Sequence, residues 1–105
     1  KPMKIEVGSG NVYRDLGVPD AERMLVKAQL ATKIGDLVKR RRLTQVEAAR
    51  LFGMTQPKIS AMLRGQFRGI SEEKMMHCLV ALGQNVQIVV KPATRGKVAG
   101  LSVAA

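Results

Sequence analysis

Residues 44–65 read TQVEAARLFGMTQPKISAMLRG, and the order of polar, apolar and glycine residues in this stretch predicts two short helices. Thr44 and Glu47 have the spacing of a capping box, in which each side chain pairs with a backbone N–H of the first turn. A helix is therefore expected to begin at Gln45. Gly53 can take the left-handed backbone that ends a helix. The predicted apolar stripe of this helix consists of Val46, Ala49, the stem of Arg50, Leu51 and Phe52.

A second helix is predicted directly after this glycine. Thr55 is its N-cap candidate, and Pro57 falls in the first turn, where the missing N–H of proline is harmless and its fixed φ suits a helix. The helix is expected over residues 56–64, and Gly65 ends it. Two short helices joined by three or four residues that include a glycine meet the requirements of a helix-turn-helix.

The size and composition of the chain favour one mainly α-helical domain. With 105 residues, 46% of them hydrophobic, the chain can build a single compact core. It has one Tyr, two Phe and no Trp, so the core must consist of Leu, Val, Ile, Ala and Met, which favours helix packing. No apolar run approaches the roughly 20 residues that span a bilayer, and no apolar signal segment begins the chain. A cytoplasmic protein without membrane contact is therefore expected.

Positive charge gathers around the predicted helix pair. The chain has 18 Lys and Arg against 8 Asp and Glu, a net charge of +10, which points to a polyanionic partner. Between Lys33 and Arg68, nine Lys or Arg stand against two acids, a local net charge of +7. Most of the charge therefore surrounds the motif, and double-stranded DNA is the predicted partner. The alternative is that the helix pair serves only packing and that the charges form a solvated surface.

The residues that could carry catalysis or bind a metal lack the necessary arrangement. His77 and Cys78 are adjacent, so on a helix their side chains point about 100° apart and cannot act together as base and nucleophile. The single cysteine leaves no disulfide and no metal cluster. The six methionines fall on helical stripes and are interpreted as core residues. We therefore expect no enzyme activity, no catalytic residue, no cofactor and no metal.

A long helix is predicted before the motif, over residues 21–41, with Asp20 as its N-cap candidate. Gly35 weakens this helix by about 1 kcal/mol relative to alanine, and the close approach of another helix is one reason for a glycine there. The cations at residues 39–42 complement the negative end of the helix dipole, and whether they also contact DNA phosphate is left open. The predicted core stripe consists of Met24, Ala28, Ala31, Ile34, Leu37 and Val38.

The segments on either side of this helical region carry weaker signals. Residues 1–19 are expected to form a partly flexible lead-in, with an extended stretch at residues 4–7 and one helical turn at residues 12–16. After the motif, Ser71 is expected to cap a helix over residues 72–82. The core positions of that helix are Met75, Cys78, Leu79 and Leu82. The helix-turn-helix domain is thus predicted to occupy residues 20–83.

One strand is predicted in the C-terminal part. Residues 85–91 are β-branched and alternate, so residues 84–92 are interpreted as a short C-terminal strand. A single strand needs a partner, which is either residues 4–7 of the same chain or the equivalent strand of a second subunit. In the second case the residues of dimerisation are Val86, Ile88 and Val90. Residues 93–105 are small and glycine-dotted and are predicted to form a mobile tail.

Helical geometry divides the second helix of the motif into two faces. If Ile59, Met62 and Leu63 point into the core, the outward positions, with Lys58 at the flank, are Gln56, Pro57, Ser60, Ala61 and Arg64. Gln56 can bond both atoms of an adenine edge, Ser60 is a less selective partner, and Pro57 or Ala61 can touch a thymine methyl group. The residues expected to hold phosphates are Gln45, Thr55, Lys58, Arg64, Gln66 and Arg68.

The stretch LTQVEAARLFGMTQPKISAMLRGQ resembles the XRE or Cro/C1-type helix-turn-helix family in its Leu-Thr-Gln opening, paired alanines, glycine turn, Thr-Gln and closing Arg-Gly. A wider resemblance, from NVYRDLGVPDAERML to ALGQNVQIVVKP, is to the HigA-type antitoxins of bacterial toxin-antitoxin pairs. By the motif match, the residues that fall where the family contacts DNA are Gln45, Thr55, Gln56, Lys58 and Ser60. Pro57 and Ala61 depart from the polar residues often found at their positions.

The resemblance implies a five-helix or similar all-α domain and a homodimer on a palindromic operator. It also implies repression of the pair's own promoter, binding of a RelE/ParE-type ribonuclease toxin, and a nucleoid-associated location in a bacterial cytoplasm. Two other hypotheses stay open: a stand-alone phage-type or metabolic regulator without a toxin, and an interaction adaptor whose basic surface binds an acidic protein. The segment that would contact a toxin is open between residues 13–16 and the C-terminal tail.

Overall fold

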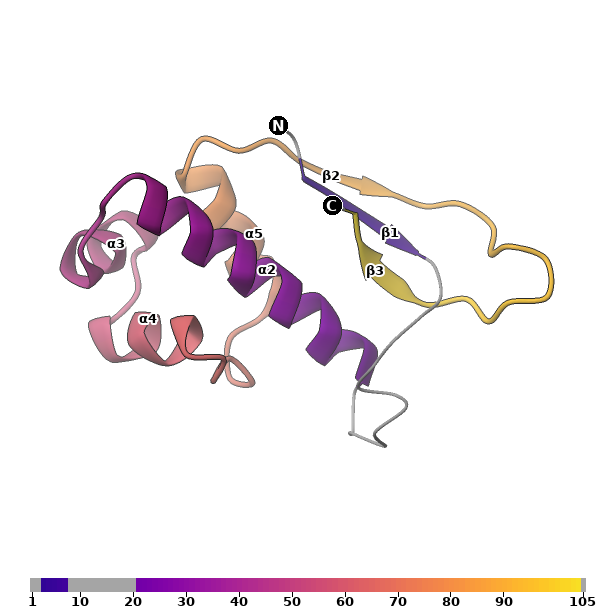
Figure 1. Cartoon of the computed structure of the whole chain (residues 1–105), viewed down its shortest axis with the longest axis horizontal. Coiled ribbons are helices and arrows are strands. Elements are labelled where there is room, and N and C mark those ends of the chain that lie inside the picture. Colours follow the sequence, from indigo (N-terminus) through magenta and orange to yellow (C-terminus); the bar gives the residue numbers. More distant parts are fainter. Residues whose placement is uncertain (1–2, 8–20, 105) are drawn as a thin grey trace.

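The computed structural model describes residues 3–7 and 21–104, and this part of the chain folds into four helices beside a small sheet (Figure 1). In chain order the elements are β1 (Met3–Val7), α2 (Ala21–Arg40), α3 (Gln45–Phe52), α4 (Gln56–Leu63), α5 (Glu72–Ala81), β2 (Val86–Val89) and β3 (Leu101–Val103). The helix pair α3 and α4 lies at one end of the molecule and the sheet lies toward the other, with α2 between them.

Local capping determines where the helices begin. The side chains of Thr44, Thr55 and Ser71 each accept a hydrogen bond from the backbone N–H three residues further on, so α3, α4 and α5 start where the sequence predicts. The ends of α2, α4 and α5 each fall one residue earlier than predicted. Four helices are described where the family resemblance implied five, and the helical turn predicted at residues 12–16 lies outside the described residues.

The sheet settles which partner the C-terminal strand takes. Its order is β2-β1-β3, and β1 runs parallel to β2, with Ile5 opposite Ile88. The partner of the predicted strand is therefore the N-terminal stretch of the same chain. The third strand corrects the expectation of a mobile tail, because Leu101–Val103 pairs antiparallel with the other side of β1. A three-residue strand is too short to show an alternating pattern, so the sequence carried no signal for it.

The three residues predicted for dimerisation have different surroundings. Val86 is half-buried and packs against the chain's own core, and its role in a dimer stays a prediction. Ile88 lies on the same face of β2 but is 65% exposed. Val90 is 79% exposed and follows the end of the strand, because β2 ends at Val89. Only the latter two present apolar surface to solvent.

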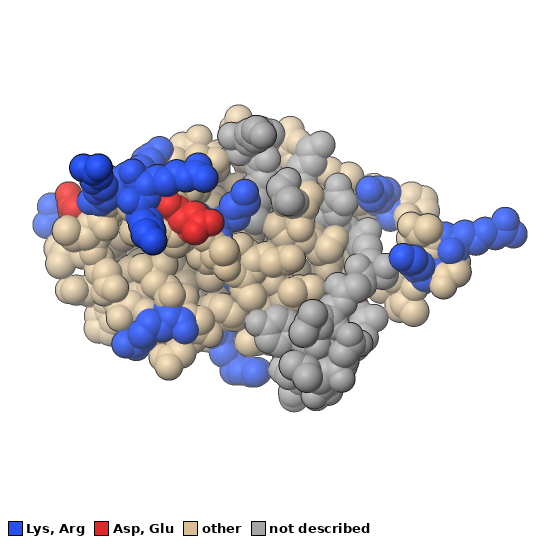
Figure 2. All heavy atoms as spheres, viewed as in Figure 1, with Lys and Arg blue, Asp and Glu red and all other residues tan. Residues whose placement is uncertain are grey.

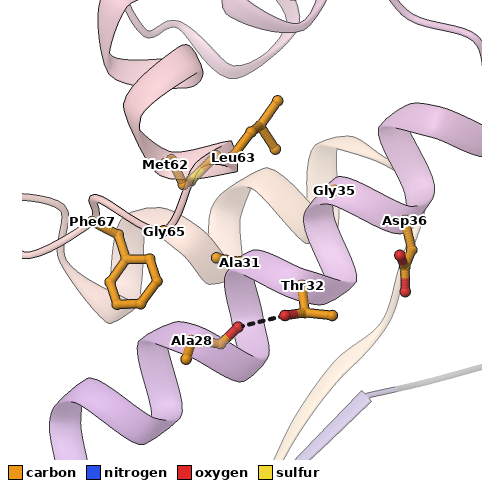
Figure 3. Close-up of a pocket in the computed structure, with 9 residues that line it drawn as sticks. All are labelled: Ala28, Ala31, Thr32, Gly35, Asp36, Met62, Leu63, Gly65 and Phe67. Carbon is orange, nitrogen blue, oxygen red and sulfur yellow. Dashed lines mark hydrogen bonds between the residues drawn. The ribbon is translucent and has the colours of Figure 1, made fainter.

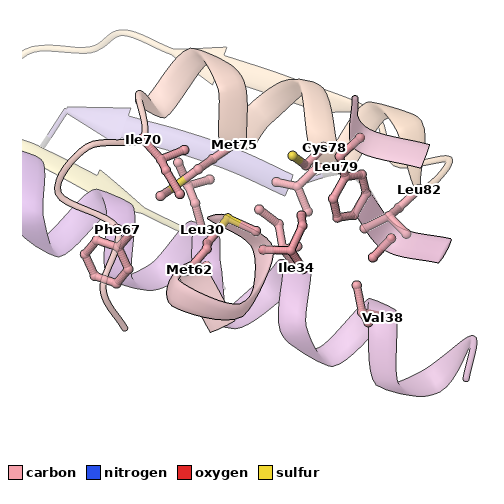
Figure 4. Close-up of a cluster of buried hydrophobic side chains, with 14 of the residues drawn as sticks. Leu30, Ile34, Val38, Met62, Phe67, Ile70, Met75, Cys78, Leu79 and Leu82 are labelled. Carbon is pink, nitrogen blue, oxygen red and sulfur yellow. The ribbon is translucent and has the colours of Figure 1, made fainter. Parts of the chain in front are cut away.

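All four described helices contribute to the core (Figure 4). All four core positions predicted in α5 are buried. In α2 the buried stripe includes the predicted Ala31, Ile34 and Val38, and it also includes Val26 and Leu30. Two further core residues, Phe67 and Ile70, come from the connection between α4 and α5. Such a connection has no periodicity, so its contribution to the core could not be read from the sequence.

The apolar stripe predicted for α3 is wrong by part of a turn. The buried residues of this helix are Ala48, Ala49 and Phe52, whereas Val46 is 50% and Leu51 43% exposed. The 8 residues of QVEAARLF make only about two turns, which are too few to fix the phase of a stripe when apolar residues occur on both sides of the helix. The paired alanines are the residues that let α3 approach its neighbours.

Candidate nucleic-acid interface

The turn between α3 and α4 holds the two helices in a defined arrangement. Gly53 has φ 63°, and its backbone N–H bonds back to the end of α3. The next residue, Met54, donates its N–H to the Ala49 carbonyl at 3.0 Å. From α5, Lys74 donates its Nζ to the Phe52 carbonyl at 2.7 Å, so a cation caps the negative end of α3. The pair is thus fixed both by its own turn and by the helix behind it.

The start of α3 is stabilised by the predicted capping box. The Thr44 N–H donates to Glu47 Oε1 at 2.8 Å, and the Glu47 N–H donates to Thr44 Oγ1 at 3.1 Å. The backbone N–H of Thr44 is the main cause that lowers the pKa of the Glu47 carboxyl, and the side chain of Thr44 adds to it. Gln45, the first residue of the helix, remains exposed beside this cap.

The burial of α4 follows the predicted division into two faces. Ile59 and Met62 are buried in the core, and Leu63 is half-buried and packs against it. Among the predicted outward residues, three are exposed at the N-terminal end of the helix, namely Gln56, Pro57 and Lys58, and Arg64 is exposed just after its C-terminal end. Ser60 and Ala61 are half-buried, so their side chains are less accessible to solvent than the other residues of this face.

The loop after α4 is tied to the fold by a buried lysine. Gln66 and Arg68, both predicted to hold phosphates, are exposed in this loop. Lys27 of α2 is only 6% exposed, and its Nζ donates to the Arg68 carbonyl at 2.8 Å. The same ammonium lies 3.7 Å from Glu72 Oε1. Because this interaction holds the backbone and not the guanidinium, the Arg68 side chain remains free to point outward.

A surface hollow joins the motif to the start of α5. Its volume is 340 Å³, and its lining residues are Gly53, Met54, Thr55, Lys58, Gly69, Ile70, Ser71 and Lys74. Thr55 and Ser71 are the N-caps of α4 and α5, so the positive ends of two helix dipoles and two lysines border one hollow. Backbone N–H groups at a helix start and nearby ammonium groups are suited to a phosphate oxygen.

The charges gather at the end of the molecule that carries the helix pair. Figure 2 shows Lys and Arg side chains over α3 and the end of α2, and a second, smaller group at the tip of the segment between β2 and β3. In the described part of the chain, no group of three or more His, Cys, Asp and Glu could hold a metal ion. Burial raises the pKa of the Cys78 thiol, so this thiol is neutral at pH 7. None of the helices described has the length and apolar character to cross a membrane.

This arrangement defines a helix-turn-helix DNA-binding domain. A family model described as a helix-turn-helix domain matches residues 12–91. A solved structure assigned by its description to the XRE family of transcriptional regulators is similar to the chain, with 39% sequence identity and a TM-score of 0.70. The match covers 76% of this chain and 90% of that chain. No curated protein matches the chain. The chain belongs to the XRE family of helix-turn-helix proteins, as its sequence motif indicated.

Three residues of the interface escaped the sequence analysis. Lys74 and Lys27 act through backbone carbonyls that lie 22 and 41 positions away in the chain, so no local pattern reveals them. Ser71 was recognised as a cap, but its position beside the N-cap of α4 depends on how α5 packs against the motif. These residues support or border the interface through tertiary contacts alone.

Proposed function

We propose that the chain is a sequence-specific transcriptional repressor whose α4 enters the major groove of DNA. The observation that carries this proposal is the exposed first turn of α4, where Gln56, Pro57 and Lys58 face solvent while Ile59 and Met62 anchor the helix in the core. A rigidly held helix that presents its N-terminal residues is the arrangement by which helix-turn-helix proteins contact base edges. The proposal assigns no catalytic role and no cofactor to the chain.

The proposed contacts fall into two groups. Gln56 reads an adenine, with Ser60 as a weaker partner and Pro57 or Ala61 against a thymine methyl group. The phosphate contacts, which set the register, come from both ends of the motif: Gln45, Thr55, Lys58, Arg64, Gln66 and Arg68.

The proposed repressor is a homodimer. In the described sheet β2 is an edge strand, with β1 on one side and no strand on the other, and the apolar side chains of Ile88 and Val90 are exposed there. A second copy that adds its β2 to this edge would satisfy backbone groups and cover both residues. A symmetric dimer would place two copies of α4 about 34 Å apart, which suits a palindromic operator.

We also propose that the repressor is the antitoxin of a toxin-antitoxin pair and binds a RelE/ParE-type ribonuclease toxin. This step rests on the resemblance to HigA-type antitoxins, which runs from residue 11 to residue 92. The competing proposal is a stand-alone phage-type regulator with the same DNA chemistry. A small basic ribonuclease-like reading frame directly beside this one would support the antitoxin role, and its absence would favour the stand-alone regulator.

The base-reading role of α4 is tested by comparing two substitutions. Gln56→Ala is expected to weaken binding by about 1 to 3 kcal/mol at one operator position and to relax the base preference there. Arg64→Ala is expected to weaken binding to all sequences alike, because a phosphate contact carries no base information. Both are measured by titration against an operator selected from random duplexes and against unselected DNA. Equal losses for the two variants on both kinds of DNA would contradict the assignment of the groove-facing residues.

The salt dependence of binding separates DNA recognition from the adaptor hypothesis. Neutralisation of phosphates by Lys and Arg releases counterions, so the affinity for duplex DNA must fall steeply as salt is raised. The adaptor hypothesis, in which the basic surface binds an acidic protein, predicts no steep loss of DNA affinity with salt. A shallow salt dependence for the selected operator would therefore argue against the repressor.

A further inference from the structure

Lys27 is the one buried charged residue among residues 21–104, and its side chain reaches from α2 to the loop after α4. Its Nζ donates to the Arg68 carbonyl at 2.8 Å and lies 3.7 Å from Glu72 Oε1. Removing an ammonium group from water is costly unless hydrogen bonds and an opposite charge offset the loss. An apolar side chain of similar length would avoid this cost. The lysine therefore indicates that the bond to the loop is what this position supplies.

The carbonyl that Lys27 bonds belongs to the central peptide of a β-turn. The Ile70 N–H donates to the Phe67 carbonyl at 3.0 Å, which closes a four-residue turn with Arg68 and Gly69 at its centre. Neither central residue has its φ in the left-handed region. A type II turn requires a positive φ at its third residue, whereas a type I turn has a negative φ at both central residues. The turn is therefore of type I.

The other type of turn is open to this sequence. Types I and II differ by a rotation of the central peptide through roughly 180°, which reverses the direction of its carbonyl. Glycine at the third position allows type II, and in the type I turn neither the φ of Gly69 nor its packing requires glycine, because an added Cβ would meet no atom within 4 Å. The rotation would carry the Arg68 carbonyl away from Lys27, whose buried ammonium would lose this hydrogen bond. The bond to Lys27 thus favours one turn type over the other.

We propose that Lys27 is a positioning residue for DNA binding, which holds the loop after α4 in the type I turn. The inference rests on the proposed function, because the residues that it positions, Gln66 and Arg68, are proposed there as phosphate contacts. Both are exposed, while Phe67 and Ile70 anchor the loop in the core. Without the ammonium, the loop would exchange between two turn types. The apparent affinity for DNA then falls in proportion to the fraction of molecules with the competent turn.

The test measures the affinity of full-chain variants for a DNA duplex that the unchanged protein selects from a random pool. Lys27→Met removes the hydrogen bond and keeps an unbranched side chain of similar length. It is expected to weaken binding about tenfold, as when one molecule in ten has the competent turn. Adding Gly69→Ala to this variant is expected to restore most of the affinity, because alanine disfavours the positive φ of a type II turn. A double variant that binds no more tightly than Lys27→Met would overturn the proposal.

A second comparison separates positioning from the loss of a charge. If Lys27 acts through the Arg68 loop, Lys27→Met should cost less affinity in a protein that already carries Arg68→Ala than in the unchanged protein. Additive losses would contradict the proposal. Lys33→Met is the matched control, since it removes the same charge from an exposed position of the same helix. Its effect is expected to be equal in both backgrounds, and Gly69→Ala should not reverse it.

Gly69→Ala alone provides a measurement that does not depend on whether Lys27→Met folds. This variant is expected to keep the DNA affinity of the unchanged protein, because the type I turn needs no positive φ at residue 69. A clear loss of affinity would overturn the proposal, since bound DNA would then require the other turn. If the unchanged protein selects no duplex, DNA binding is refuted and the role of Lys27 falls with it. If it selects a duplex and the variants do not behave as expected, only the role of Lys27 is refuted.

Discussion

At the residue scale, Glu47 makes the start of α3 sensitive to acid. Hydrogen bonds from Thr44 hold the pKa of this carboxyl below its ordinary value of 4.5. A lowered pKa in the folded state means that the capping box contributes its full stability above about pH 4.5 and loses it as the pH falls through the lowered value. Glu47→Gln is therefore expected to reduce the difference in thermal midpoint between about pH 6 and pH 3. Glu73→Gln, an exposed carboxyl in the first turn of α5, is the control, and equal effects of the two changes would contradict this role.

The same scale shows what the sequence could and could not predict. Caps are local, so Thr44, Thr55 and Ser71 and the left-handed Gly53 were all predictable from residues within four positions. Lys74 bonds the Phe52 carbonyl, and nothing near either residue in the chain indicates the pair. Exposure of the side chains proposed to face DNA followed from the helical period, whereas the half-burial of Ser60 depends on how neighbouring helices pack.

At the scale of elements, Gly35 tests how closely α2 and α4 pack. A hollow of 410 Å³ lies between them, lined by Gly35 and Asp36 of α2 and by Leu63 of α4, among others (Figure 3). A Cβ added at Gly35 would be 3.6 Å from Leu63 Cδ2, an ordinary contact. The neighbouring helix is therefore present as anticipated, but it does not require a glycine. Gly35→Ala is expected to raise the free energy of unfolding by about 1 kcal/mol and to leave DNA binding unchanged.

The control for this prediction is a glycine whose backbone does need freedom. Gly53 has φ 63°, so Gly53→Ala is expected to destabilise the protein by about 1 kcal/mol or more. Urea unfolding of both variants provides the comparison. If Gly35→Ala also lowered stability, α2 and α4 would have to pack more tightly than the 3.6 Å contact indicates.

The helices and strands differ in how well their bounds and buried faces could be predicted from the sequence. The 20 residues of α2 contain enough turns for a periodic stripe to be recognised, and its helix was predicted to within one residue. The eight residues of α3 were placed correctly by their caps, but their buried face was not. The three residues of β3 gave no pattern, and the strand forms because β1 offers a second edge to pair with. Short elements are thus determined by their neighbours more than by their own residues.

At the scale of the whole molecule, the sheet and the helix pair lie at different ends, which suits a division between assembly and DNA binding. The side chains at the two ends differ in the same way. The largest group of cations surrounds α3 and the end of α2 (Figure 2), whereas the exposed apolar side chains of β2 lie on the sheet. A second copy joined through β2 would leave both helix-turn-helix motifs free. The proposed dimer can therefore be tested without touching the residues proposed to face DNA.

Ile88→Glu is the variant that tests the proposed dimer. Across a two-fold axis the new carboxylate would meet its own copy, and like charges in a desolvated strand pair repel, so the variant is expected to be monomeric at micromolar concentration. Its affinity for a palindromic operator should fall toward that of a half-site, since one α4 grips only one half. Val80→Glu, which places the same charge on an exposed valine of α5, should remain dimeric. Light scattering after size exclusion measures the mass of each variant, and a dimeric Ile88→Glu variant would show that the joint lies elsewhere.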